Sequence, residues 1–66
     1  MEDEFIFHTY VKLNSEYKEG YKVCKELEDS TGMLIYKSKF IALDEFRDRL
    51  FSKENWKKIC EKEKEN

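Results

Sequence analysis

The chain has 66 residues and a net charge of −2, and charged residues make up 42% of it while aromatic residues make up 15%. This length allows one small domain with a thin core, since a chain of about 60 residues buries only about 60% of its unfolded surface. The aromatic content excludes a typical disordered segment, and no apolar run reaches the roughly 18 residues of a membrane span.

Small domains usually need a disulfide, a metal or a partner subunit to supplement their core. Cys24 and Cys60 lie far apart, and the acidic start MEDE is unlike a secretory signal, so we expect reduced thiols in a cytoplasmic protein. His8 is the only histidine and no CxxC or HxxxH spacing occurs, so neither a metal nor a cofactor is expected. By elimination, we expect a homodimer.

The first predicted element is a β-strand over residues 4–14, EFIFHTYVKLN. Phe5, Phe7, Val11 and Leu13 alternate with residues such as Ile6 in the period-two pattern of a strand rich in aromatic and β-branched residues. The segment NSEYKEG then forms a loop, in which Gly20 is available for a positive φ.

Residues 15–29 fit two interpretations. As a strand, Tyr21, Val23 and Leu27 alternate with charged residues; as a helix, Tyr17, Tyr21, Cys24 and Leu27 share one side. The turn DSTG runs straight into MLIYKSKF, which favours a β-hairpin over residues 21–42. The helical interpretation would give a βαβα arrangement instead.

A helical region is predicted over residues 44–64, either as one helix or with a break at Ser52, which could cap a second helix. The expected fold class is therefore α+β. It consists of a small antiparallel β-sheet of about three strands, with one or two C-terminal helices packed on it, in a single domain that pairs as a dimer.

No residue pattern indicates catalysis. His8 has no nucleophile motif near it, and Asp44, Glu45 and Asp48 are explained by the favourable position of acidic residues in a first helical turn. We therefore expect a protein that is not an enzyme.

Two binding surfaces are conceivable. Tyr36, Lys37, Lys39 and Phe40 interleave aromatic and basic groups as a single-stranded nucleic-acid platform would, although the chain is acidic overall. Alternatively, the acidic residues could imitate DNA phosphates and engage a basic protein groove. These are Glu2, Asp3 and Glu4 before the first strand, Glu26, Glu28 and Asp29 at the turn, and Asp44, Glu45 and Asp48 at the helix start.

The order of four features carries a family resemblance. The run YKV at residues 21–23, a turn ending in Gly32, a strand through Tyr36 and the sequence LDEF at Leu43–Phe46 together resemble the small uracil-DNA glycosylase inhibitors of phi29-like Bacillus phages. The resemblance covers roughly residues 21–51.

The resemblance implies a homodimeric phage DNA mimic that acts in the bacterial cytoplasm, occupies the DNA-binding groove of the host glycosylase and captures its protruding apolar side chain. It assigns the important helix phenylalanine to Phe46. For the family's aromatic residue about one turn later there is no exact counterpart: Leu50 stands nearest, and Phe51 is one place off. The family's strand glutamate falls near Tyr36 or Lys37. The alternatives are a small nucleic-acid-binding or transcription-modulating protein and a structural interaction module.

Overall fold

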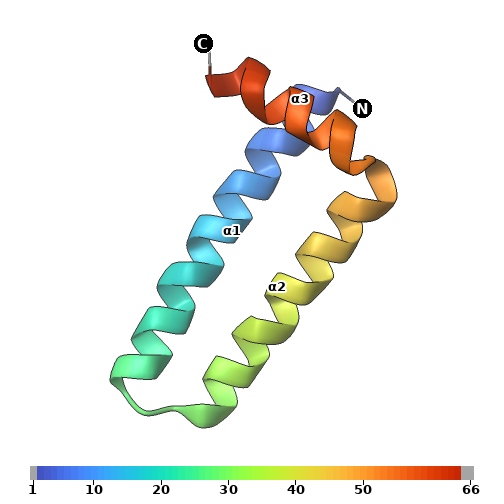
Figure 1. Cartoon of the computed structure of the whole chain (residues 1–66). Helices are drawn as coiled ribbons and strands as arrows, with labels where there is room; N and C mark the ends of the chain where they lie inside the picture. The colour runs from blue at the N-terminus through green and yellow to red at the C-terminus, as the bar shows by residue number, and fades with distance from the viewer. Residues whose placement is uncertain (1, 65–66) are drawn as a thin grey trace.

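The structure, a computed structural model, describes residues 2–64, and within this range the chain forms three α-helices and no strand. They are α1 (Asp3–Glu26), α2 (Ser30–Leu50) and α3 (Lys53–Lys64). Helices α1 and α2 form a long antiparallel hairpin, and α3 crosses its open end beside the start of α1 (Figure 1). The predicted α+β class, with its three-stranded antiparallel sheet, is wrong: the fold is all-α.

A heptad-like spacing explains why α1 and α2 pair. In each helix a series of less exposed residues is spaced in alternating steps of three and four, which is the spacing of a seam between two helices. In α1 these residues are Ile6, Tyr10, Leu13, Tyr17, Gly20 and Cys24, and in α2 they are Met33, Tyr36, Phe40, Leu43 and Arg47.

The predicted strand over residues 4–14 lies entirely within α1. Its aromatic and β-branched residues favour strands only weakly, because strand propensity depends mainly on packing context. The predicted strand stops just after Leu13, but the seam spacing continues through Tyr17 to Cys24. A single helix over the whole segment accounts for that spacing. For residues 15–29, the helical alternative is therefore correct up to Glu26, where α1 ends.

Gly20 lies inside α1 and does not adopt the positive φ expected of a loop glycine. A Cβ at this position would overlap the ring of Tyr36 on α2. The same ring lies near Tyr17, with 6.4 Å between ring centroids, and under the ammonium of Lys39, 4.9 Å away. The absence of a side chain at Gly20 thus makes room for an aromatic group in the seam.

The predicted β-hairpin over residues 21–42 is wrong: the end of α1, a short turn and most of α2 occupy this segment. Glu28 takes the left-handed conformation, with φ 57°, while its N–H donates to Lys25 O and that of Asp29 donates to Cys24 O. This pair of bonds is a Schellman ending of α1. The Asp29 carboxylate then accepts a bond from Gly32 N at 3.0 Å and caps α2. The segment read as a Gly turn is therefore the first turn of a helix.

The C-terminal helical region is interrupted at Ser52, as one of the two interpretations expected. Ser52 Oγ accepts a bond from Asn55 N at 3.1 Å and caps α3. However, α2 begins at Ser30 and not at Asp44. Asp44 and its acidic neighbours therefore lie in the C-terminal half of α2, where the helix dipole does not favour them.

The core is thin. Leu43, with 9% of its surface exposed, is the only buried residue in the part of the chain that the structure describes. Trp56 of α3 adds an aromatic cluster at the open end of the hairpin, with ring centroids 4.9 Å from Tyr10, 5.6 Å from Phe7 and 5.5 Å from Phe51. No helix within residues 2–64 is both long and apolar enough to cross a membrane.

Replacing Leu43 tests the importance of this single buried side chain. We expect Leu43→Ala to lower the free energy of unfolding by about 2–3 kcal/mol, because it removes apolar contacts and leaves a cavity. The exposed neighbour Ile41 provides the control, and Ile41→Ala should change stability by less than about 0.5 kcal/mol. Urea unfolding followed by circular dichroism measures both; equal effects would contradict the assignment of the core to Leu43.

Candidate protein-binding pocket

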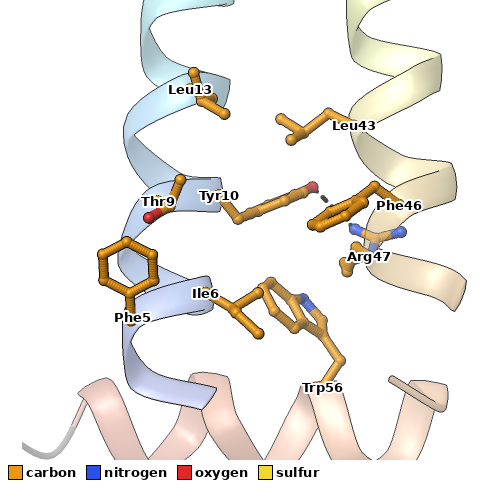
Figure 2. Close-up of a pocket in the computed structure, with 9 residues that line it drawn as sticks. All are labelled: Phe5, Ile6, Thr9, Tyr10, Leu13, Leu43, Phe46, Arg47 and Trp56. Carbon is orange, nitrogen blue, oxygen red and sulfur yellow. Dashed lines mark hydrogen bonds between the residues drawn. The ribbon is translucent and has the colours of Figure 1, made fainter. Parts of the chain in front are cut away.

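An apolar pocket of about 130 Å³ opens between the N-terminal half of α1, the C-terminal half of α2 and α3 (Figure 2). Leu13 and Leu43 point toward each other across the seam, and Trp56 reaches up from α3 (Figure 2). The principal apolar lining residues are Phe5, Ile6, Leu13, Leu43, Phe46 and Trp56.

The pocket is open to solvent on one side of the hairpin. Leu43 lines it while nearly buried, whereas Phe5 and Phe46 at its edge remain 62% and 55% exposed. An engineered cavity of about 150 Å³ in another protein holds benzene, so this volume suits one apolar group of the size of a leucine or phenyl side chain. Filling the pocket would remove from water both its own apolar lining and the apolar group that enters it.

Tyr10 and Arg47, which also line the pocket, belong to a polar network. Tyr10 Oη donates a hydrogen bond to Asp44 Oδ1 at 2.8 Å and accepts one from Arg47 Nη1 at 2.9 Å. Arg47 also pairs with Asp48 at 3.1 Å, and its guanidinium lies 5.4 Å from the centroid of the Tyr10 ring. These contacts tie α1 to α2 and hold Tyr10 in place beside the pocket.

The network shifts two pKa values. Burial raises the pKa of Tyr10, and its hydrogen bond to the Asp44 carboxylate raises it further, while the positive charge of Arg47 opposes both effects. Burial acts to lower the pKa of Arg47, but its bond to Asp48 and the neighbouring negative charges raise it overall. The network therefore contains a neutral phenol and a charged guanidinium at ordinary pH.

The three predicted acidic groups do not converge on one surface. Glu26, Glu28 and Asp29 lie at the hairpin turn, at the far end from α3 (Figure 1). Asp44 and Asp48 flank Arg47 near the pocket. Glu2, Asp3 and Glu4 lie at the start of α1, and Glu45 is exposed on α2.

The predicted aromatic and apolar site residues are also divided. Phe46 lines the pocket, and Leu50, which is exposed, follows it one turn later. Phe51 lies between α2 and α3 against Trp56. Tyr36 belongs to the α1–α2 seam. Of the predicted site residues, only Phe46 lines the pocket.

The nucleic-acid platform predicted from Tyr36, Lys37, Lys39 and Phe40 is not formed as one row. Tyr36 and Phe40 both face Tyr17 of α1, at centroid distances of 6.4 and 6.0 Å. Lys39 lies over the rings of Tyr17 and Tyr36, while Lys37 is exposed. Tyr36 and Phe40 thus pack against α1.

Sequence reasoning missed most of the pocket. The strand pattern places Phe5 on a sheet face, and nothing in it brings Tyr10, Leu43 and Arg47 together. The signal that could have found them is the seam spacing itself, because Tyr10 on α1 and both Leu43 and Arg47 on α2 occupy seam positions.

A second polar cluster joins α3 to α1. His8 Nε2 lies 3.3 Å from Glu63 Oε2, and the ligand-type atoms of Glu4, His8 and Glu63 all lie within 4.8 Å of one another. His8 is exposed and was predicted to be on a strand; instead it lies on α1, facing the end of α3. Cys24 and Cys60 are free thiols and half-buried.

No protein-family model matches the chain, and comparisons with curated proteins and with solved structures find no match either.

The raised pKa of Tyr10 predicts a pH dependence of stability. A group whose pKa is higher in the folded state stabilises the fold below its unfolded pKa, about 10 for tyrosine, and that contribution is lost as the pH rises through the folded value. We expect Tyr10→Phe to remove this loss and to cost about 1 kcal/mol at neutral pH through the missing hydrogen bonds. Urea unfolding at pH 7 and above pH 10 measures both effects, and an identical pH dependence in the two proteins would contradict the prediction.

Proposed function

We propose that the protein is a non-catalytic protein-binding module whose pocket between α1, α2 and α3 receives an apolar side chain of another chain. One observation carries the proposal: an apolar pocket of about 130 Å³ opens to solvent between two largely exposed phenylalanines, Phe5 and Phe46. Exposed aromatic surface around a hollow is typical of interaction sites.

The expected energetics follow from the pocket walls. A few buried apolar anchors usually supply most of the affinity of a protein interface. Here the anchor would contact Leu43 and Phe46, and the charged groups of Asp44, Arg47 and Asp48 lie beside it. Exposed charges at such a position affect the association rate more than the affinity.

Uracil-DNA glycosylase, the target implied by the resemblance, stays a proposal. One observation favours it: Phe46, the residue that the resemblance marks as important, lines the pocket. The strands on which the resemblance depended are absent from residues 2–64, and the acidic groups are spread over both ends of the hairpin. Capture of an apolar side chain is therefore better supported than imitation of DNA phosphates.

Binding of a small apolar probe tests the pocket directly. Trp56 is the single tryptophan and lines the pocket, so its fluorescence should change saturably as toluene is added to dilute protein. We expect Phe46→Ala to weaken toluene binding roughly fivefold, which corresponds to about 1 kcal/mol. Ile41→Ala, which lies outside the pocket, should leave binding unchanged. A fluorescence change that does not saturate in the folded wild type would contradict the proposal.

The target itself is tested by uracil excision. A bacterial uracil-DNA glycosylase acts on a uracil-containing oligonucleotide with and without an equimolar amount of this protein. We expect excision to be lost with the wild type, retained with Phe46→Ala because the pocket edge is removed, and lost with Ile41→Ala. Complete excision in the presence of the folded wild type would reject the glycosylase as the target.

A further inference from the structure

Exposed apolar side chains occur at both ends of the hairpin face that carries the pocket. Val23 follows Phe5 on α1 by a whole number of turns, about five at 3.6 residues per turn, so both side chains leave the helix in the same direction. Ile35 precedes Phe46 on α2 by about three turns and shares its direction. All four side chains are exposed. We call the surface of Phe5, Val23, Ile35 and Phe46 the open face.

The chain exposes more surface than a compact monomer of its mass. The chain exposes 5493 Å², whereas a folded monomer of 8.1 kDa is expected to expose roughly 4,500 Å². The surplus of roughly 1,000 Å² is close to the roughly 800 Å² that each partner buries in a stable interface of standard size. The open face, with its pocket and four large exposed side chains, is a surface whose burial would remove part of that surplus.

The open face is also self-complementary. On α1 the midpoint between Phe5 and Val23 is Asn14, and on α2 the midpoint between Ile35 and Phe46 falls beside Phe40. The hydrogen bond from Tyr10 to Asp44 and the contact of Tyr17 with Phe40 place these two midpoints at nearly the same level of the hairpin. A single two-fold axis that crosses the hairpin at this level, perpendicular to the helices, therefore relates the two apolar residues of α1 to each other and the two of α2 to each other.

We propose that a second copy of this chain covers the open face, with the two hairpins antiparallel across this axis. The rotation sets Val23 of each copy opposite Phe5 of the other and Ile35 opposite Phe46. The aliphatic end of one face thus meets the pocket end of the other, and Ile35 is the side chain that enters the pocket. This assignment rests on the proposed function, because it names the partner of the same pocket.

Charge supports the antiparallel pairing. Lys12 and Glu16 lie on the α1 side of the open face, one turn apart and equally far from Asn14 on either side. The two-fold axis therefore brings Lys12 of each copy opposite Glu16 of the other. A parallel two-fold arrangement would instead leave the two hollow pockets facing one another.

The test compares two neighbouring exposed residues of α2. Sedimentation equilibrium at about 100 µM should give twice the mass of 8.1 kDa for the wild type. Ile35→Asp should weaken the dimer more than tenfold, because it buries a carboxylate in the pocket. Leu34→Asp is the matched control: Leu34 is exposed on the other side of α2, so the dimer should persist. A monomeric wild type, or equal weakening by both folded variants, would overturn the proposal.

A charge reversal tests the geometry without placing charge in the apolar pocket. Lys12→Glu should weaken the dimer, since two carboxylates then face each other, and Lys12→Glu combined with Glu16→Lys should restore it. Failure of the double variant to restore the dimer would overturn the antiparallel arrangement.

Toluene binding to monomeric Ile35→Asp separates the two proposals. Saturable binding by a protein that is monomeric even as wild type would leave the pocket function standing and remove the dimer. A wild-type dimer whose Ile35→Asp monomer binds no toluene would remove the pocket function and with it the insertion of Ile35.

Discussion

A pair of helices has only one seam, and this constraint governs the whole molecule. Each helix can cover one stripe of the other, so side chains on the two flanks of the seam stay in contact with water unless a third element covers them. Helix α3 is short and crosses only the open end of the hairpin (Figure 1). Leu43, which lies in the seam beside the pocket that Trp56 of α3 also lines, is the one buried residue of the described chain.

The seam is held by two different kinds of contact. Toward the turn, Tyr36 lies across Gly20, and the rings of Tyr17 and Phe40 pack at right angles. Toward α3, the network of Tyr10, Asp44 and Arg47 bridges the helices through hydrogen bonds. The hydrogen bonds of this network hold Tyr10 beside the pocket.

The sequence predicts the end of this chain better than its beginning. The helix over the C-terminal third and the cap at Ser52 follow from local signals, and both are present. The first half could be read as strand because Phe5, Phe7, Val11 and Leu13 happen to alternate over one short stretch. What decides the structure is the longer spacing from Ile6 to Cys24, which has meaning only when a second helix with matching spacing packs against it. The turn was misread for a related reason: Gly32 suggested a β-turn, whereas Asp29 and Glu28 form the helix cap and ending.

The pocket was predicted only in part for the same reason. Phe46 was singled out by resemblance, but its neighbours in space come from three helices that sequence reasoning did not bring together. Local chemistry gave no indication of which charged residues would be neighbours, because that depends on the register of α1 against α2.

The pocket lies on the same face that the second copy is proposed to cover, and this has a consequence for how the protein would respond to its own abundance. A target that needs the pocket competes with Ile35 of the other copy, so only the unpaired chains can bind it. When pairing is strong, the amount of unpaired chain grows only as the square root of the total amount. The protein would therefore act most efficiently per molecule when scarce, and accumulation would store it in a form that is stable but unavailable.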